Sequence, residues 1–456
     1  MSVFERFERV RRSEGQLDSG GRGHTPRGRA SRSLRAIVRD AKRDMLDRVG
    51  FAEVARLARD SDTRHSREEL RPAVEAVINA RDTGELSQED REEVVVEVLD
   101  DVVGLGPLQP LIEDDSVTEI MVNGCMSTYF EQAGTLHAMG RLFDDDEQIR
   151  ILIDRIISPL GRRIDERSPI VNARLSQGYR VNAVIPPIAI DGPILTIRKF
   201  SDRISSLKEL VDLGSLPEWY AQLLSCAVSL RQDLAVAGGT GSGKTTLLNA
   251  LSCEIPVGER IVTIEDSAEL KFSRHPHVVR LEARAASIEG EGEVTIRDLV
   301  TNALRMRPDR IIVGECRSDE AIDMLQAMNT GHDGSLTTLH ANAPREAVER
   351  LVTMVRFAVE LPPDAIEAQI GNALDLIVQT ARRPGGARCI SEIAEVSFDH
   401  GRRRCVVRTL YRWEVGQEAG FWLDYPQWVD RLAPMGLADR REVKAWMRSL
   451  DLRQSA

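Results

Sequence analysis

The spacing of hydrophobic residues changes along the 456-residue chain and divides it into regions. Residues 34–112 place apolar side chains three and four positions apart, as in REELRPAVEAVINA and QEDREEVVVEVLDDVV, which predicts a small helical bundle. From 113 to 203 the pattern shortens to alternation in VTEIMVNG, STYFEQAG and PILTIRKF, and VNARLSQGYRVNAVI predicts a hairpin around a Ser-Gln-Gly turn. Together with one amphipathic helix, DDEQIRILIDRIISPLG, these strands predict an α+β domain.

Strands and helices alternate in the following region, residues 204–416. The apolar runs LAVAG, RIVTIED, RIIVGE and SLTTLHA predict strands, and each precedes a helix-forming run. These helices are expected to begin at Lys244, Thr295, Asp319 and Pro344. Such alternation predicts an α/β domain with a mostly parallel sheet covered on both faces. Residues 417–456 predict a helical tail of two short amphipathic helices that contain Trp422, Trp428 and Trp446.

Composition limits the class of protein. Residues 1–33 are rich in Gly, Arg and Ser and poor in apolar groups, which predicts a disordered basic leader. The chain has no run of about 18 apolar residues and no apolar core of a secretory signal near its start, so we expect a cytoplasmic protein. Six scattered cysteines without a C-x-x-C pair argue against a zinc site and against a disulfide framework. The net charge of −11 disfavours a nucleic-acid binder, and no specific nucleic acid is expected as a partner.

A glycine-rich motif lies between the apolar strand LAVAG and the helix-forming run TTLLNALSCEI. It fits G-x-x-x-x-G-K-[ST] and consists, with the next residue, of Gly238, Gly239, Thr240, Gly241, Ser242, Gly243, Lys244, Thr245 and Thr246. The glycines let backbone N–H groups surround phosphate oxygens, and the helix start adds its positive dipole end. Lys244 is expected to reach the β- and γ-phosphates and Thr245 to hold magnesium, so the motif predicts ATP and Mg²⁺ as ligands.

Two groups of acids follow predicted strands. Glu315 ends the strand RIIVGE, where an acid can bind the magnesium shell through water or orient the attacking water. The segment TIEDSAE supplies Glu265, Asp266 and Glu269 just past another strand. A carboxylate there can position water, but Asp and Ser also cap loops and helices, and the spacing alone leaves both interpretations open.

Histidines and arginines supply the remaining candidates. His332 and His340 flank GSLTTL, and they are either structural or a γ-phosphate sensor. A metal site is disfavoured, because no third ligand lies nearby in the sequence. Charge develops on the γ-phosphoryl oxygens during hydrolysis, and an arginine can stabilise it. Arg174 and Arg180 flank the predicted hairpin turn, and Arg198 lies on the next strand. From the residues alone, solvated strand arginines remain the simpler interpretation.

Four motifs in order resemble a known family: GGTGSGKTT, TIEDSAEL, RPDRIIVGECR and TGHDGSLTTLHAN. They are similar to the Walker A loop, Asp box, Walker B stretch and His box of the secretion-superfamily ATPases that drive type II secretion, type IV secretion and type IV pili. The resemblance covers about residues 100–415. GLGPLQPLIEDDSVTEIMVNG and VNARLSQGYRVNAVIPPIAIDGPILTIRKF look most like the tight-adherence (Flp/Tad) pilus assembly ATPases, the CpaF-like branch.

The resemblance implies a RecA-like P-loop ATPase domain preceded by an α+β, PAS-like N-terminal domain. It also implies a ring hexamer that holds ATP between these two domains and works on inner-membrane pilus or secretion platform proteins at the cytoplasmic face. The implied roles are water handling by Glu269 with Glu265 and Asp266, the Walker B acid Glu315, the His-box pair His332 and His340, and γ-phosphate contacts from Arg174 and Arg180.

The expected function is therefore that of an ATP-hydrolysing motor that assembles a Flp/Tad-type (type IVc) pilus. A type IV secretion traffic ATPase that exports protein or DNA shares every motif and remains the alternative. A non-hydrolysing nucleotide-binding scaffold is disfavoured by the acids Glu269 and Glu315. A helicase is disfavoured by the acidic balance and by the lack of a basic, aromatic-rich strand-binding face.

Overall fold

The computed structural model describes residues 27–449, apart from gaps at 51–52, 54–55, 58–62, 81–86, 133, 176, 200–205, 273, 285, 287–290, 384–385 and 418–419. Residues 1–26 of the expected disordered leader lie outside this range. Helix α2 (Arg27–Val49) begins before residue 34, where the helical bundle was expected to start. The chain divides into two compact units, Met1–Ser201 and Asp202–Ala456.

The first unit begins with three helices, α2, α4 (Thr63–Ala80) and α5 (Gln88–Val103), over the segments where the apolar spacing predicts them. Ser87 caps α5, because its hydroxyl accepts the N–H of Asp90 at 3.1 Å and Asp90 accepts the N–H of Ser87 at 3.2 Å. The three helices bury one shared apolar cluster whose members include Met45, Val74 and Val98. None of the helices in the described part of the chain has the length and apolar character needed to cross a bilayer.

The described residues that follow form a six-stranded antiparallel sheet in the order β3-β2-β1-β6-β5-β4. The predicted hairpin is confirmed, since β4 and β5 pair with Arg174 opposite Arg180. Strand β3 was not expected, because its side chains are mostly exposed and carry no alternating apolar pattern. The bounds are β1 (Val117–Asn123), β2 (Ser127–Gln132), β3 (Thr135–Gly140), β4 (Ile170–Arg174), β5 (Arg180–Val184) and β6 (Ile194–Arg198), with η1 (Gly106–Leu108), α6 (Gln109–Glu113), α7 (Asp146–Ile157) and η2 (Ser158–Leu160).

The second unit is built on a nine-stranded sheet of described residues, ordered β15-β14-β13-β12-β7-β11-β10-β8-β9. All neighbours from β12 to β9 are parallel, whereas β13 to β15 add an antiparallel extension. The expected α/β fold with a parallel-rich sheet is confirmed. The strands are β7 (Leu234–Gly238), β8 (Ile261–Glu265), β9 (Val278–Glu282), β10 (Arg310–Val313), β11 (Leu336–Leu339), β12 (Leu376–Arg382), β13 (Arg388–Asp399), β14 (Arg404–Arg412) and β15 (Phe421–Trp422).

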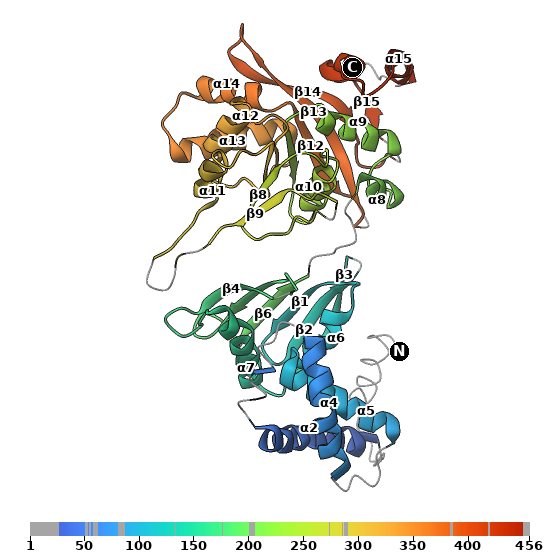
Figure 1. The fold of residues 1–456 in the computed structure, drawn as a ribbon, viewed down its shortest axis with the longest axis vertical. Coiled ribbons are helices and arrows are strands. Elements are labelled where there is room, and N and C mark those ends of the chain that lie inside the picture. Colours follow the sequence, from blue (N-terminus) through green and yellow to red (C-terminus); the bar gives the residue numbers. More distant parts are fainter. Residues whose placement is uncertain are drawn as a thin grey trace. The chain divides into compact units, whose positions relative to one another are not determined.

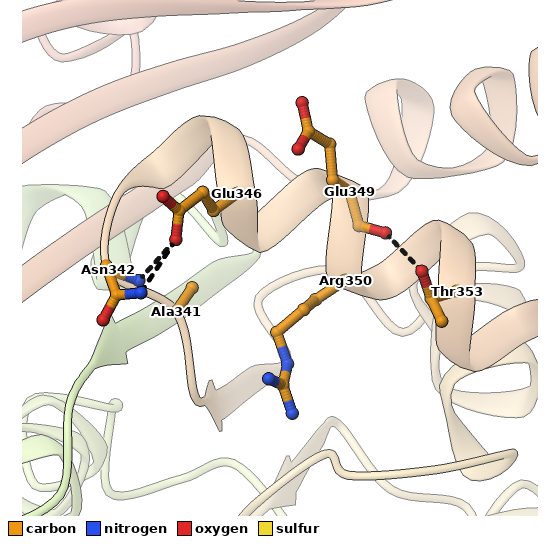
Figure 2. A pocket seen from close by; sticks show the side chains of 6 residues that line it. All are labelled: Ala341, Asn342, Glu346, Glu349, Arg350 and Thr353. Atoms are coloured by element: carbon orange, nitrogen blue, oxygen red, sulfur yellow. Dashed lines mark hydrogen bonds between the residues drawn. The ribbon is translucent and has the colours of Figure 1, made fainter.

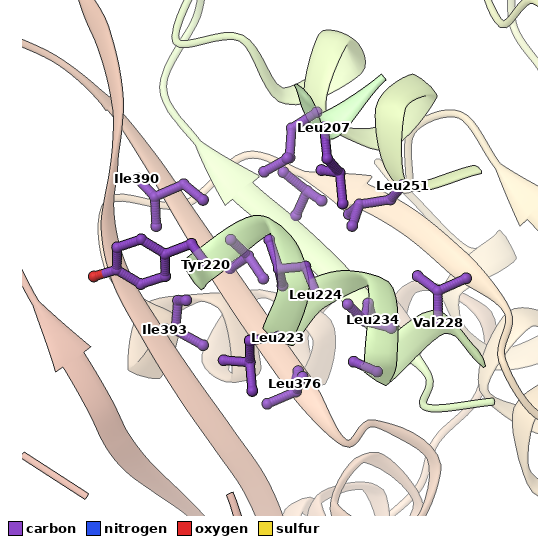
Figure 3. Close-up of a cluster of buried hydrophobic side chains, with 14 of the residues drawn as sticks. Leu207, Tyr220, Leu223, Leu224, Val228, Leu234, Leu251, Leu376, Ile390 and Ile393 are labelled. Carbon is purple, nitrogen blue, oxygen red and sulfur yellow. The ribbon is translucent and has the colours of Figure 1, made fainter. Parts of the chain in front are cut away.

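Helices cover both faces of this sheet (Figure 1). Alternate residues of β7 face two apolar clusters: Leu234 and Val236 contribute to one, Ala235 and Ala237 to the other. Figure 3 shows the first cluster, in which Leu224 lies near Leu234. This cluster is covered by α8 (Leu207–Asp212), α9 (Glu218–Ser229) and α10 (Lys244–Ser252), and the second by α11 (Ile296–Ala303), α12 (Glu320–Asn329), α13 (Pro344–Ala358) and α14 (Pro363–Ala373).

The C-terminal tail differs from the expected pair of helices. Trp422 lies on strand β15, where it pairs with Tyr411 of β14, so the tail first extends the sheet. The reason is burial, since the Trp422 ring centroid lies 5.0 Å from that of Trp219 on α9. Trp428 lies on a 3₁₀ turn, and only Trp446 lies on an α-helix of the tail. These elements are η3 (Gln427–Arg431) and α15 (Arg440–Ser449).

Candidate active site

The glycine-rich loop joins the C-terminal end of β7 to the first turn of α10, as the sequence predicts. Gly241 and Gly243 adopt φ values of +71° and +96°, which side chains other than glycine rarely take. A Cβ atom on Gly239 or Gly241 would meet nothing within 4 Å. The loop is therefore open above the N-terminus of α10, a geometry that suits an anion such as phosphate.

Lys244, the first residue of α10, is largely buried with 8% of its surface exposed. Its ammonium Nζ donates hydrogen bonds to the carbonyl oxygens of Gly238 at 3.1 Å and Gly239 at 2.9 Å. The charge thus sits inside the loop, held by neutral oxygens. Phosphate oxygens would be stronger partners, because hydrogen bonds between two charged groups are roughly twice as strong.

Glu315 and His340 join this lysine at the same edge of the sheet. They follow β10 and β11, which run parallel to β7 and end at the edge where the loop lies. His340 Nε2 lies 2.9 Å from Glu315 Oε1, and His340 Nδ1 lies 3.4 Å from Lys244 Nζ. The structure thereby brings together three residues that the sequence places up to 96 positions apart.

The charges of this cluster settle its protonation. Burial, followed by the positive charge of Lys244, lowers the pKa of His340, so its ring is neutral near neutral pH. Burial alone would raise the pKa of Glu315, but the hydrogen bond and charge of Arg317, together with the charge of Lys244, outweigh it and lower that pKa. Glu315 is therefore an ionised carboxylate beside a neutral imidazole.

Arg317 is a further member of the site, and no role was predicted for it. Its Nη2 donates to Glu315 Oε2 at 2.5 Å, and its Nη1 lies 3.6 Å from Asp266 Oδ2. The hydrogen bond to Glu315, and also the charges of Asp266 and Glu269, raise the pKa of Arg317. This arginine links Glu315 to the acids that follow β8. The available signal was its place two residues after Glu315 in the RPDRIIVGECR motif.

Glu265, the last residue of β8, is 3% exposed. Its Oε1 accepts the N–H groups of Glu269 at 2.8 Å and Leu270 at 3.0 Å, so it shapes the loop that carries Glu269. Within the described residues its other oxygen, Oε2, has no hydrogen-bond partner. Burial raises the pKa of Glu265. One oxygen of Glu265 therefore has the structural role of capping the loop. The second oxygen is available for a catalytic role, so that interpretation stays open.

The two histidines of the GSLTTL segment do not meet. His340 follows β11, whereas His332 precedes it, at the opposite end of this strand. A four-residue strand spans about 13 Å. The carbonyl oxygen of His332 accepts the hydroxyl of Ser335 at 2.8 Å, which ties it to the turn before the strand. Within one chain, only His340 of the two candidate histidines therefore lies beside Lys244 and Glu315.

Arg174 and Arg180 lie in the first unit, on β4 and β5. They are register partners across the hairpin. Arg174 Nε also donates to the carbonyl oxygen of Gly178 in the turn, at 3.1 Å. Their role in hydrolysis remains a prediction.

A pocket of about 270 Å³ is lined by residues that follow His340 in the sequence (Figure 2). Asn342 Nδ2 donates to Glu346 at 3.0 Å on one side of it. The positive charge of Arg350 is among those that lower the pKa of His340, which connects this pocket electrostatically with the active site. Its lining consists of Ala341, Asn342, Glu346, Glu349, Arg350 and Thr353.

The oxygen groups of the site fit a magnesium–nucleotide complex. Mg²⁺ prefers hard oxygen ligands, and it commonly combines one or two protein groups with substrate phosphates and water. The Thr245 hydroxyl, on the first turn of α10, and the ionised Glu315 carboxylate are such groups. The buried, partnerless Oε2 of Glu265, described above, is a further oxygen of the kind that suits a hydrated ion or water.

Comparisons with known proteins identify the family. A profile of the family described as "Type II/IV secretion system protein" matches residues 101–408. A putative conjugal transfer protein of Mycobacterium tuberculosis is 38% identical over 312 residues, which cover 67% of this chain and 88% of that protein. The conjugal transfer protein TrbB of Rhizobium radiobacter is 33% identical over 290 residues, covering 62% and 85%.

Among solved structures, the VirB11 ATPase of the Brucella suis type IV secretion system, in complex with sulphate, is 31% identical. The match covers 63% of this chain and 92% of that one, with a TM-score of 0.35. The pilus retraction motor PilT with bound ADP is 19% identical over 76% of this chain and 89% of that one, with a TM-score of 0.47. By the extent of the family profile and the identity to its relatives, the chain belongs to the type II/IV secretion system protein family.

Proposed function

We propose that this chain is an ATP-hydrolysing motor of a type II/IV secretion machine. The observation that carries the proposal is the cluster at one sheet edge, where the Lys244 ammonium lies inside an open glycine loop and His340 links it to Glu315. Membership of the type II/IV secretion system family adds support, because relatives named for secretion and conjugal transfer share most of the chain.

In this proposal the chain's own groups divide the work of phosphoryl transfer. Lys244 and the loop N–H groups bind the phosphates, and Thr245 and Glu315 hold Mg²⁺, which neutralises charge on the β- and γ-phosphates when it is bound. Glu269 positions the attacking water with the help of Glu265, which hydrogen-bonds the loop carrying Glu269. The lowered pKa of Glu315 keeps its carboxylate ionised, as binding of Mg²⁺ requires.

Arg174 and Arg180 supply positive charge to the γ-phosphoryl oxygens in the same proposal. The support is the resemblance of the hairpin sequence to the family and the register of β4 and β5, which places the two arginines opposite each other beside the turn. Arg174→Ala and Arg180→Ala are therefore expected to lower turnover by at least roughly tenfold while nucleotide affinity stays within a few fold. If neither variant slows hydrolysis, these arginines have no part in it.

The cargo separates two versions of the motor. The motifs around GLGPLQP and the β4–β5 hairpin resemble Flp/Tad pilus assembly ATPases, which favours a ring hexamer that extrudes pilins at the cytoplasmic face of the inner membrane. The names of the relatives favour a type IV secretion traffic ATPase that moves protein or DNA. Deleting the gene in its host separates the two: loss of surface pili with intact conjugal transfer supports the pilus motor, and the converse supports the traffic ATPase.

The hydrolytic part of the proposal is tested by phosphate release from ATP with magnesium. The wild-type chain is expected to turn over without added DNA, and Glu315→Gln to lose roughly 10²- to 10³-fold, because an amide replaces the ionised acid. Glu360→Gln, an exposed acid after α13 and outside the pocket, is the control and is expected to match the wild type. A wild-type chain that binds ATP without releasing phosphate would favour a non-hydrolysing scaffold instead.

A further inference from the structure

The glycine loop is held from outside by two residues of the neighbouring strands, Thr380 on β12 and Arg388 at the start of β13. We propose that these two are positioning residues of the nucleotide site, which fix the shape of the loop before nucleotide binds and thereby set its affinity. The inference rests on the proposed function, because it assumes that the loop binds ATP. Neither residue belongs to the four motifs that the sequence analysis singled out.

Thr380 contacts the loop from strand β12. Strand β12 runs parallel to β7 with Thr380 opposite Gly238, and Thr380 is 5% exposed. Its hydroxyl donates to the carbonyl oxygen of Ala237 at 3.1 Å and lies 2.7 Å from the hydroxyl of Ser242. The Ser242 hydroxyl also lies 2.8 Å from the carbonyl oxygen of Gly239, but it has a single proton and donates it to Thr380 when Thr380 donates to Ala237. A chain of two hydroxyl groups therefore joins both ends of the loop to β12.

This contact also explains why a glycine ends β7. A Cβ atom on Gly238 would lie 2.3 Å from Thr380 Oγ1 and 2.5 Å from Ser242 Oγ. Such distances are far inside van der Waals contact, so any larger residue would separate the loop from Thr380. Gly238 and Thr380 thus act as a matched pair.

Arg388 holds the loop from the other side. Its Nε donates to the carbonyl oxygen of Gly241 at 3.1 Å, and its Cδ lies 3.2 Å from where a Cβ on Gly243 would be. The carbonyl of Gly241 and the N–H of Ser242 belong to one planar peptide and point in opposite directions. By fixing that carbonyl, Arg388 also fixes the direction of the Ser242 N–H, which here donates to the carbonyl oxygen of Gly239 at 3.4 Å.

The physical benefit is preorganisation. Glycine loses more backbone freedom on ordering than any other residue, so a loop rich in glycine pays that entropy cost when it closes on a ligand. Contacts that order the loop in advance reduce this cost and raise affinity. Strands β12 and β13 form a hairpin that carries Thr380 and Arg388, and this β12–β13 hairpin is itself anchored, because the Arg383 guanidinium lies 4.9 Å from the centre of the Trp413 ring.

The test is an equilibrium titration of the full-length chain with fluorescent N-methylanthraniloyl-ADP and magnesium. Thr380→Val keeps the side chain's shape without the hydroxyl, and Arg388→Ala removes the guanidinium. Each is expected to weaken binding roughly five- to tenfold, the loss of about one hydrogen bond. Thr380→Ser, which restores a hydroxyl, is expected to stay within about threefold of the wild type, and Arg388→Lys to fall between alanine and arginine.

Arg382→Ala is the matched control, since Arg382 is the exposed register partner of Arg388 and its guanidinium donates to Gly386 within the hairpin. It is expected to bind as the wild type does. A positioning role further predicts that KM for ATP rises in Thr380→Val and Arg388→Ala while kcat stays within a few fold. In both variants the unfolding temperature without nucleotide is expected to change little. The rise in unfolding temperature that ADP produces is expected to be smaller than in the wild type.

Several results would overturn the inference. Wild-type affinity in both Thr380→Val and Arg388→Ala would do so while leaving the proposed function intact. If Arg382→Ala lost as much nucleotide affinity as Arg388→Ala, or if Thr380→Ser bound as weakly as Thr380→Val, the substitutions would act through a general effect on the β12–β13 hairpin and not through positioning of the loop. A wild-type chain that binds no nucleotide would overturn the proposed function and this inference together.

Discussion

The imidazole Nε2 of His340 lies 2.9 Å from the carboxylate Oε1 of Glu315. The other ring nitrogen faces the Lys244 ammonium at 3.4 Å, so one ring spans the distance between the acid after β10 and the lysine of the glycine loop. A side chain in this position responds to charge on both sides. Accordingly, the charge of Lys244 lowers the pKa of His340 and the charge of Glu315 raises it.

The first prediction concerns the stability of the fold against pH. The pKa of His340 lies below its ordinary value of 6.5, because burial and then Lys244 disfavour the imidazolium form. As pH falls through about 6.5 the unfolded chain takes up this proton before the folded one, so folding stability decreases. His340→Gln cannot titrate, and its unfolding temperature is expected to fall less than that of the wild type between about pH 7.5 and about pH 5.5. Calorimetry at both pH values checks this; equal declines would contradict it.

The second prediction concerns Arg317. Its hydrogen bond and charge are what outweigh the effect of burial and lower the pKa of Glu315. In Arg317→Gln the pKa of Glu315 is expected to rise, so the acidic limb of the pH–turnover profile moves to higher pH. Glu315 also stabilises the folded state above its ordinary pKa of 4.5, and that contribution is lost as pH falls through the lower folded-state pKa.

Arg297→Gln is the control for Arg317, because Arg297 pairs with Asp319 at 3.1 Å and with Asp323 at 2.7 Å. Its pH–turnover profile is expected to overlay that of the wild type. An unshifted profile in Arg317→Gln would mean that Arg317 does not set the protonation of Glu315.

The third prediction concerns Glu265, where stability and activity are expected to oppose each other. Burial raises its pKa, so ionising it costs folding stability as pH rises above 4.5. Glu265→Gln keeps an oxygen for the N–H groups of Glu269 and Leu270 and removes the buried charge. At neutral pH we expect an unfolding temperature higher by roughly 2–4 °C and a turnover lower by at least about tenfold. A lower unfolding temperature with unchanged turnover would exclude this trade-off.

The fourth prediction concerns the fit of Gly238. A Cβ there would also lie 2.8 Å from the carbonyl oxygen of Thr380, which cannot move without shifting β12. Gly238→Ala is expected to destabilise the fold by about 1–3 kcal/mol and to weaken nucleotide binding. Gly258→Ala is the control, because a Cβ at Gly258 meets nothing within 4 Å. Chemical denaturation and a nucleotide titration measure both effects, and a stable Gly238→Ala that binds normally would refute the fit.

Local patterns in the sequence were enough to predict most elements of the second unit from β7 to α13, whereas α14 and the strands β12 to β14 were not predicted. The alternation of apolar strands and amphipathic helices indicated the parallel-rich sheet, and the glycine motif indicated the loop between β7 and α10. Strand β9 was not expected, because it lies at the sheet edge and its VVRLE side chains are only partly buried. The strand that contains Trp422 was not predicted either, since it depends on pairing with Tyr411 and on packing against Trp219.

Contacts between distant segments could not be predicted, because the sequence does not specify which strands are neighbours. Thr380 and Arg388 meet the glycine loop across 138 and 147 residues because β12 lies beside β7. Conversely, His332 and His340 are close in sequence and separated by a strand. Closeness along the chain therefore gives no indication of the contacts that Thr380 and Arg388 make with the glycine loop.

The most direct test of the central claim is the affinity of the chain for labelled ATP with magnesium, compared between the wild type and Lys244→Ala. The ammonium lies within the glycine loop, where its carbonyl partners are weaker than phosphate oxygens. We predict saturable binding by the wild type and a loss of at least roughly 100-fold in Lys244→Ala, the scale of a buried charged hydrogen bond. Equal binding by the two proteins, or no binding by the wild type, would contradict the account.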